Sequence, residues 1–385
     1  MSKVELKSDL DYYDIVRQKL EVGPLHAPKH EKIIELLKVF WPEEELIKIL
    51  SHFPQAGEHI TLNELAEKTG MEKIAIKKIL KKATKKKTVS LTKYGYGLEP
   101  LAPGIFEAYF VARTDTPENL QKASTIFRWL FKHVGELEAQ GLRLFDKEFE
   151  MFRPLLPIET KEKLIKIDET VTSESQVLPY ELVEDLINKN DYWAYVPCQC
   201  RMIGEMNGEP CDCAPSEMGC FMTGRGARGA VSFGWAKPLA TKEEAIEYLK
   251  KTEKAGLVHL TSNSKGGEHL WFICNCCPCH CGALMPAKNL GYKSAIPSNF
   301  KPKIDPETCV ECETCVEKCP MDAISHPEEG KMLIDSAICI GCGLCASNCP
   351  QNAITLEKIH NVVPPDKKLI GKKMFMQMLS ELLMS

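Results

Sequence analysis

The chain has 385 residues, a formal net charge of −4, 26% charged residues and 44% hydrophobic residues. This length predicts two or three domains, and the hydrophobic fraction excludes a disordered chain with too little apolar surface to bury. The near-neutral charge excludes a general polycation that coats nucleic acid. The chain has 18 cysteines, which is an unusually large number. None of them precedes Cys198, so they all belong to the second half of the chain.

The first residues, 1–5, carry no apolar signal-peptide core, so we expect a cytoplasmic protein. In a reducing cytosol, a dense group of cysteines binds metal more often than it forms disulfides. One uncharged stretch, residues 269–287, has the length of a membrane span, but it holds five cysteines, two prolines and two histidines. We therefore predict no transmembrane segment.

Residues 1–112 are expected to form a helical region that ends in a small domain. A capping-box pattern over 61–64 begins one helix of this domain, and residues 71–85 form the next helix. Alternating residues at 89–92, followed by the glycine turn 94–97, predict a hairpin. This order of helix, turn, helix and hairpin resembles a winged-helix domain.

The second helix of this pair and its end carry a row of lysines. Its members are Lys73, Lys77, Lys78, Lys81, Lys82, Lys85, Lys86 and Lys87. Such a row could neutralise several DNA phosphates. It contains no arginine or asparagine that would read a base edge through two hydrogen bonds, so sequence-specific DNA recognition is not favoured. Non-specific charge attraction is the simpler interpretation, and a solvated helix face or a dock for an acidic protein are the alternatives.

Residues 113–176 are expected to form a helical connector. Its helix begins at 116–117 with threonine and proline, which suit a first turn. The polar run 172–176 marks a loop or domain boundary, and Pro179 opens another helix. At the other end of the chain, residues 358–385 form an amphipathic tail, which we expect to dock on the body of the protein or on a partner.

Near the C-terminus a run of four cysteines recurs with a period of 30 residues. The first run is Cys309, Cys312, Cys315 and Cys319, and the second is Cys339, Cys342, Cys345 and Cys349, each followed by proline. Three thiolates at i, i+3 and i+6 on a tight loop can cap one face of an iron–sulfur cube, and the fourth must come from elsewhere. Zinc ribbons also contain paired C-x2-C, but they do not require three evenly spaced cysteines followed by Cys-Pro.

Residues 301–357 resemble the bacterial two-cluster ferredoxin, in which the fourth cysteine of each run binds the other cluster. The resemblance implies one 4Fe–4S cluster on Cys309, Cys312, Cys315 and Cys349 and a second on Cys339, Cys342, Cys345 and Cys319. The second loop has Gly341 and Gly343 where the first has Glu311 and Glu313, so we expect different reduction potentials. Four lysines and ten acidic residues give this segment a net charge of −6, which suits brief encounters with basic redox proteins.

The other ten cysteines fall in residues 177–300, the expected middle domain. They are Cys198, Cys200, Cys211, Cys213, Cys220, Cys274, Cys276, Cys277, Cys279 and Cys281. Ten thiolates exceed the need of one centre, so we expect a further 4Fe–4S cluster here, with zinc, a second extra cluster or redox-active thiols as alternatives. The adjacent Cys276 and Cys277 cannot easily face one tetrahedral zinc, which favours iron–sulfur or two separate centres.

The motifs of this middle domain are Pro-Cys-x-Cys-Arg at 197–201, Gly-Leu-Val-His at 256–259 and Ile-Cys-Asn-Cys-Cys-x-Cys at 273–279. Together they resemble a domain of multi-cluster ferredoxin-type proteins of anaerobes, and this resemblance implies a cofactor but no substrate. His280 is either a ligand or a neighbouring group. Nearby arginines, which either offset thiolate charge or lie on the surface, are Arg201, Arg225 and Arg228.

Residues 224–229 match the pattern G-x-G-x-x-G. A dinucleotide site needs a hydrophobic strand before this motif and a helix that begins within it. We expect neither here, because the preceding residues and the following glycines and proline are not typical of them. The segment is therefore predicted to be a flexible loop beside the cysteines.

We predict an α+β protein with a helical, winged-helix-like N-terminal half, a cysteine-rich middle domain and a C-terminal ferredoxin-like dicluster module. The expected function is the relay of single electrons through two 4Fe–4S clusters to or from a further metal centre in the middle domain. This describes a carrier or an oxidoreductase subunit better than a stand-alone enzyme, and it needs no catalytic acid or base. The alternatives are an iron–sulfur, redox-responsive transcription regulator and an oxidoreductase subunit with a substrate-accessible middle cluster.

Overall fold

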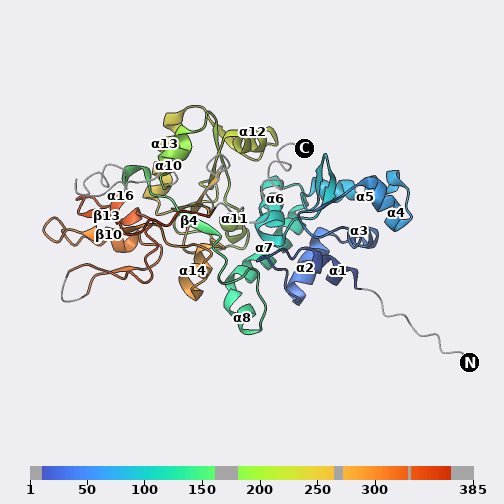
Figure 1. Cartoon of the computed structure of the whole chain (residues 1–385), viewed down its shortest axis with the longest axis horizontal. Helices are drawn as coiled ribbons and strands as arrows, with labels where there is room; N and C mark the ends of the chain where they lie inside the picture. Colours follow the sequence, from blue (N-terminus) through green and yellow to red (C-terminus); the bar gives the residue numbers. More distant parts are fainter. Residues whose placement is uncertain (1–10, 161–180, 264–271, 328–330, 366–385) are drawn as a thin grey trace, which may run out of the picture. The chain divides into compact units, whose positions relative to one another are not determined.

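Figure 1 shows the computed structural model of the chain, which describes residues 11–160, 181–263, 272–327 and 331–365. The chain divides after Asp146 into two compact units. None of the helices within the described ranges is long and apolar enough to cross a membrane. The expected loop at 172–176, the helix start at Pro179 and most of the predicted tail lie outside the described residues.

Helices make up most of the first unit. They are α1 (Tyr12–Lys19), α2 (Glu31–Phe40), α3 (Glu44–Leu50), α4 (Leu62–Thr69), α5 (Lys73–Lys85), α6 (Phe106–Ala112), α7 (Pro117–Lys132) and α8 (Val134–Ala139), with the turn η1 (Leu101–Ile105) before α6. Aromatic rings fill their core: the ring centroids of Phe40 and Tyr109 lie 4.9 Å apart, and those of Phe106 and Phe127 lie 4.7 Å apart. Burial of these large apolar side chains holds the helices together.

A three-stranded antiparallel sheet accompanies helices α4 and α5, of which α5 carries most of the row of lysines. Its strands β1 (His59–Ile60), β2 (Ser90–Thr92) and β3 (Gly95–Gly97) lie in the order β1-β3-β2. The predicted capping box is confirmed, because Thr61 and Glu64 accept each other's backbone N–H at 3.2 and 2.8 Å. Gly95 has a φ of 124°, and a Cβ there would lie 2.3 Å from the carbonyl oxygen of Ile60, so the hairpin turn requires glycine.

A six-stranded antiparallel sheet forms the centre of the second unit (Figure 1). Its strands are β4 (Phe152–Pro154), β5 (Trp193–Val196), β6 (Cys220–Thr223), β7 (Lys237–Leu239), β8 (Val258–Ser262) and β9 (Phe272–Cys276). They lie in the order β4-β8-β9-β6-β5-β7. The cysteine-bearing strands β6 and β9 are therefore neighbours, with Phe221 opposite Ile273.

Among the described residues, five helices accompany this sheet before the last module. They are α10 (Val183–Asn188), α11 (Gln199–Met206), α12 (Gly224–Ser232), α13 (Lys242–Lys254) and α14 (Leu284–Leu290), and the turn η2 (Ile158–Thr160) precedes them. Leu186 of α10 and Leu249 of α13 are buried against Phe221 of the sheet. Helix α11 begins directly after Cys198 and α14 begins shortly after Cys281, so both helices position cysteines at their starts.

The G-x-G-x-x-G segment is helical, so the predicted flexible loop is wrong. Helix α12 (Gly224–Ser232) follows strand β6 directly. Its small residues Ala227 and Ala230 are buried against Ala194 of the sheet, so small side chains serve close packing here and not flexibility. Strand β6 pairs antiparallel with both of its neighbours, so this strand and helix do not form part of a parallel βαβ unit.

The C-terminal module is built from two similar halves. Its elements are the strands β10 (Phe300–Ile304), β11 (Ile324–Ser325), β12 (Leu333–Ile334) and β13 (Ile354–Lys358) and the helices α15 (Thr314–Glu317) and α16 (Leu344–Ser347). Strand β10 pairs with β13, and β11 pairs with β12. The β10–β13 pair joins the two ends of the module.

Candidate metal centres

Each four-cysteine run forms a loop that leads into a short helix. Two residues of each loop have a left-handed backbone at equivalent positions: φ is 55° and 59° at Glu311 and Glu313, and 64° and 77° at Gly341 and Gly343. These turns bend the backbone around a hollow instead of continuing a strand or a helix. Several thiols of one loop can therefore face the same hollow.

The first hollow is lined by thiols from both runs. Its cysteines are Cys309, Cys312, Cys315 and Cys349. Ile304, Met332 and Ile354 supply an apolar lining, and Cys312 is exposed to solvent. Four thiols around a mostly apolar hollow fit the ligand set and the low-polarity surroundings of a 4Fe–4S cluster. The structure thus brings together the four cysteines that the ferredoxin resemblance implies for one cluster.

The other four cysteines of the two runs gather in a more buried place. Burial, together with the neighbouring Cys319 and Cys339, raises the pKa of the Cys342 thiol to about 12. Burial also raises the pKa of Cys345, and the same neighbours add to the rise. Thiols that resist ionisation in the protein alone need a bound cation to hold them as thiolates. This environment fits a metal cluster on the second set that the resemblance implies.

The two loops differ in their surroundings. A Cβ on Gly341 would lie 2.1 Å from the carbonyl oxygen of Phe300, so this loop packs directly on backbone. The equivalent residue of the first loop is Glu311, which is exposed and pairs with His326 at 3.5 Å. Glu313 binds the same imidazole at 2.8 Å. The first loop is therefore polar and open to solvent, whereas the second is enclosed.

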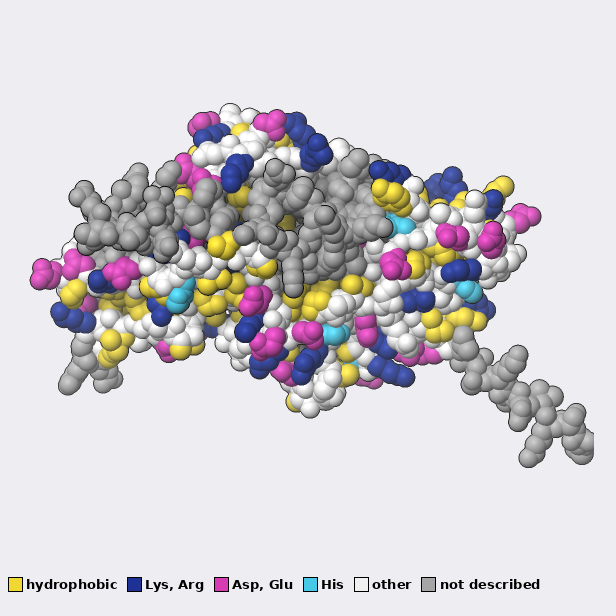
Figure 2. Space-filling view, in the orientation of Figure 1, with side chains coloured by type: hydrophobic (Ala, Val, Ile, Leu, Met, Phe, Trp, Pro, Cys, Tyr) yellow, Lys and Arg dark blue, Asp and Glu magenta, His cyan; other side chains and the backbone are white. Residues whose placement is uncertain are grey.

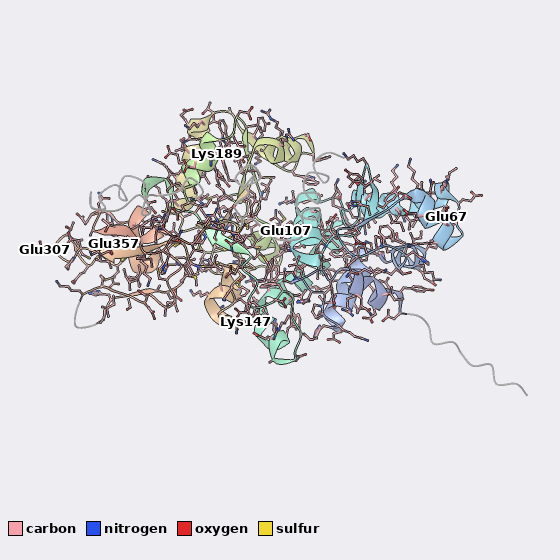
Figure 3. The ribbon with its side chains drawn as sticks, in the orientation of Figure 1. Glu67, Glu107, Lys147, Lys189, Glu307 and Glu357 are labelled. Atoms are coloured by element: carbon pink, nitrogen blue, oxygen red, sulfur yellow. The ribbon has the colours of Figure 1, made fainter. Side chains whose placement is uncertain are left out.

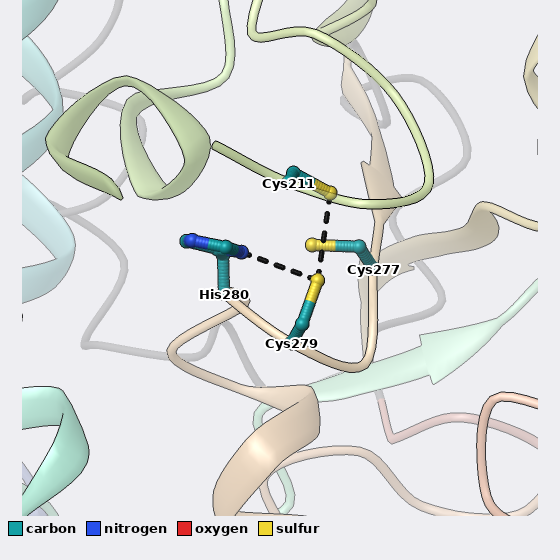
Figure 4. Close-up of side chains that lie close together, drawn as sticks. All are labelled: Cys211, Cys277, Cys279 and His280. Atoms are coloured by element: carbon teal, nitrogen blue, oxygen red, sulfur yellow. Dashed lines mark hydrogen bonds between the residues drawn. The ribbon is translucent and has the colours of Figure 1, made fainter. Parts of the chain in front are cut away.

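A compact group of metal-ligating side chains lies in the middle region (Figure 4). The ligand atoms of Cys211, Cys277, Cys279 and His280 all lie within 4.8 Å of one another. The sulfurs of Cys211 and Cys279 are 3.5 Å apart. Cys213 interacts with the same pair: hydrogen bonding with Cys211 raises the pKa of the Cys213 thiol to about 11, and hydrogen bonding with Cys279 opposes this rise. We call these four cysteines with His280 the tight group.

His280 presents one ring nitrogen to the tight group. Its Nε2 lies 2.9 Å from the carbonyl oxygen of Glu209, and a carbonyl only accepts, so Nε2 carries the proton. Its Nδ1 lies 3.2 Å from the Cys279 sulfur. A Cβ on Gly204 would lie 2.3 Å from Nε2, so glycine makes room for the ring. His280 is oriented either as a ligand or as a partner of a ligating sulfur.

The remaining six middle-region thiols form a second, wider group. They are Cys198, Cys200, Cys220, Cys274, Cys276 and Cys281. Their thiols interact in succession: Cys198 and Cys281 raise the pKa of Cys200, and Cys274 and Cys281 raise the pKa of Cys276. The sulfur of Cys274 lies 3.5 Å from that of Cys220. Among the described residues, the 4.8 Å condition is met by Cys211, Cys277, Cys279 and His280 and not by these six, so we call the six the wide group.

Strand β9 explains why adjacent cysteines separate. Successive side chains of a strand point to opposite faces. Cys274 and Cys276 therefore join the wide group, while Cys277, at the end of the strand, joins the tight group. The expectation that Cys276 and Cys277 do not face one ion agrees with this arrangement.

A buried arginine lies between the two groups. Arg201 is 0% exposed, and its guanidinium donates to the carbonyl oxygens of Pro215, Asn275 and Met218. Thiols of both groups, Cys198 of the wide group and Cys277 of the tight group, raise its pKa. Arg201 is thus placed to offset thiolate charge. The other two arginines considered, Arg225 and Arg228, are exposed.

A chain of buried polar side chains, which the sequence did not single out, starts within the cysteine motif of β9. Asn275 Oδ1 lies 2.7 Å from His259 Nδ1, and His259 Nε2 lies 3.1 Å from the Glu253 carboxylate. The Glu253 carbonyl accepts from Asn348 of the C-terminal module at 3.2 Å. Asn275 could have been found from the sequence, because it is a polar residue between two cysteines of an apolar segment.

The wide group and the enclosed ferredoxin-type thiols share one apolar cluster of side chains. Cys276 and Cys281 of the wide group are buried in it with Ile340 and Leu344 of the second loop. Partly buried thiols that pack against the same cluster are Cys274, Cys319, Cys339 and Cys342. Apolar side chains of the described residues therefore connect these two sets of thiols.

A family model described as the 4Fe-4S dicluster domain matches residues 302–356. The match begins within β10, ends within β13 and contains both cysteine loops. No curated protein and no solved structure matches the chain. This part of the chain is thus a 4Fe-4S dicluster domain, which follows a cysteine-rich region.

Proposed function

We propose that this protein transfers single electrons through two 4Fe–4S clusters to or from a further metal centre in the middle region. The shared apolar cluster around Cys276 and Cys339 carries the proposal, since it joins the dicluster domain to the middle thiols. The exposed Cys312 marks a solvent-facing side of the domain. Electrons would enter or leave at the open cluster and pass through the enclosed one.

The ligand assignment follows the grouping of the thiols. One cluster would be held by Cys309, Cys312, Cys315 and Cys349, and the other by Cys319, Cys339, Cys342 and Cys345. Each bound cluster supplies one-electron chemistry. The chain supplies the thiolates, the apolar lining of the open site and the close packing of Gly341 at the enclosed site, all of which set the reduction potential.

The two middle groups suit different metals. Sulfurs around a tetrahedral zinc are separated by about 3.8 Å, given zinc–sulfur bonds of about 2.3 Å. The tight group approaches this spacing, so we propose zinc there, with either His280 or Cys213 completing the ligand set. The wide group is too spread for one ion and has enough thiols for the further 4Fe–4S cluster.

The surface of the C-terminal module favours a basic redox partner. Figure 2 shows acidic side chains over this module, where Glu307 and Glu357 are labelled in Figure 3. Glu357 pairs with Lys303 at 2.7 Å, but acids outnumber lysines in the segment and leave it at −6. Such a surface steers brief encounters between charged electron carriers.

A redox-responsive regulator is the second candidate, because the elements of the first unit follow the order of a winged-helix domain. Helix α3, strand β1, helices α4 and α5 and the β2–β3 hairpin give that order. However, Lys82 pairs with Glu43 and Lys86 with Asp115, each at 2.9 Å, so part of the lysine row is engaged within the protein. A cluster-dependent gel shift on one specific DNA sequence would make this candidate the preferred one.

Metal analysis of anaerobically purified protein tests the main proposal. We expect twelve irons, matching acid-labile sulfide and one zinc per chain. Eight irons would leave the wide group without a cluster. Protein that is colourless and free of iron after strict exclusion of oxygen would contradict the proposal altogether.

A further inference from the structure

The wide group has two more thiols than one 4Fe–4S cluster needs. Such a cluster takes four cysteine ligands. Four of the six thiols lie at the ends of helices and strands where a cluster could be enclosed, namely Cys198, Cys200, Cys276 and Cys281. The other two, Cys220 and Cys274, belong to neighbouring strands and face each other.

Strand register places Cys220 directly opposite Cys274. Strands β6 and β9 are antiparallel, with Phe221 opposite Ile273, and extending this register by one residue puts Cys220 opposite Cys274. Directly opposed residues have Cα atoms about 4.5–5.5 Å apart, which falls within the range that a disulfide spans. Their sulfurs already lie 3.5 Å apart. A bond could therefore form by side-chain rotation, without moving the strands.

The position of the pair suits electron exchange. Cys274 packs against the apolar cluster that holds Cys276 and the enclosed ferredoxin-type thiols. Both Cys220 and Cys274 are partly exposed, so protons can reach them from solvent. Cys274 thus lies beside the proposed electron path, and both thiols of the pair are partly accessible to solvent.

We propose that Cys220 and Cys274 form a redox-active pair that closes to a disulfide and opens to a dithiol. The proposal rests on the electron-transfer function proposed above. The sulfur–sulfur bond breaks as the pair takes up two electrons and two protons from water, which gives two thiols; the two bound 4Fe–4S clusters of the dicluster domain would supply these electrons, one each. The dithiol thereby stores, as a pair, two electrons that arrive one at a time. The dithiol can pass this pair of electrons to a substrate disulfide by thiol–disulfide exchange, in which the pair is oxidised again and the substrate is reduced.

The first test uses the unaltered full-length protein under strict exclusion of oxygen. After mild oxidation, free thiols are alkylated and the digest is searched for a peptide pair that joins Cys220 to Cys274. We expect this link, and we expect it to disappear when reduced methyl viologen, a one-electron donor, reduces the clusters. Absence of the link, or its persistence beside fully reduced clusters, would overturn the proposal.

The second test compares the double variant Cys220→Ser/Cys274→Ser with the matched variant Cys200→Ser. The double variant should keep its full iron content and take up two fewer electrons per chain in a reductive titration. Cys200→Ser should lose iron. Loss of iron from the double variant would show that the pair ligates the cluster and would overturn the proposal. Clusters that cannot be reduced at all would instead refute the electron-transfer function and, with it, the source of the electrons.

Discussion

The Nη1 atom of Arg201 donates a hydrogen bond to the carbonyl oxygen of Asn275 at 2.9 Å, across 74 positions of sequence. This bond ties the start of α11, which carries Cys200, to strand β9, which carries Cys274 and Cys276. A buried cation is costly unless anions compensate it, and the nearby thiols supply them when they ionise. Arg201 therefore links the two middle groups both by hydrogen bonds and by charge.

Replacing Arg201 with methionine should reduce the metal content of both middle groups. The change removes the counter-charge and takes a donor from three backbone carbonyls, of which that of Pro215 keeps the N–H of Met218, at a cost to folding of about 2–5 kcal/mol. Arg201→Lys keeps the charge but cannot reach all three carbonyls, so it should retain more metal than Arg201→Met. Zinc and iron analysis, with denaturant unfolding, measures both effects. An Arg201→Met protein with full metal content and unchanged stability would contradict the assigned role.

Cys349→Ser should damage the open cluster, although Cys349 belongs to the second run. The reason is that Cys349 lines the same hollow as Cys309 and Cys315. The EPR spectrum of reduced Cys349→Ser should therefore resemble that of Cys309→Ser. If it resembled that of Cys339→Ser instead, each run would bind its own cluster and the crossed assignment would be wrong.

Gly341→Ala should destabilise the enclosed site, whereas Glu311→Ala at the equivalent position should be tolerated. The new methyl group at 341 would lie 2.1 Å from a carbonyl oxygen, in a left-handed backbone that itself costs a non-glycine residue about 1–2 kcal/mol. Glu311 already occupies such a backbone and is exposed. Iron content and thermal unfolding of the two variants provide the comparison. Equal effects of both changes would contradict the difference between the enclosed and the open loop.

The potential of the open cluster should depend on pH through His326. Hydrogen bonding to Glu313, with the charge of Glu311, raises the pKa of this imidazole above its usual 6.5. The protonated ring favours the more negative, reduced cluster, so the potential should be highest while the ring is protonated and should fall as the pH rises through the raised pKa of His326. His326→Gln should flatten this dependence in a redox titration followed by EPR. An equally steep dependence in the variant would exclude His326 as its cause.

The dicluster domain could be predicted from the sequence because the residues that define it lie close together along the chain. The spacing from Cys309 to Cys319 and its repeat fix the loops, and the alternation of β9 separates Cys276 from Cys277. The burial of Arg201 and the addition of β4 to the sheet depend on residues far apart in sequence, and no local pattern encodes them. Helix α12 was missed because its glycines were taken as flexible, whereas they serve close packing.

EPR spectroscopy of the dicluster domain during stepwise reduction of the whole protein is the decisive measurement. Two clusters held by interleaved cysteines lie close together, so we expect the signal of a first reduced cluster to broaden into a spin-coupled spectrum as the second accepts its electron. The fully reduced form should hold two such electrons in this domain. A single isolated signal, or none, would contradict the view that this chain carries electrons through a pair of neighbouring clusters.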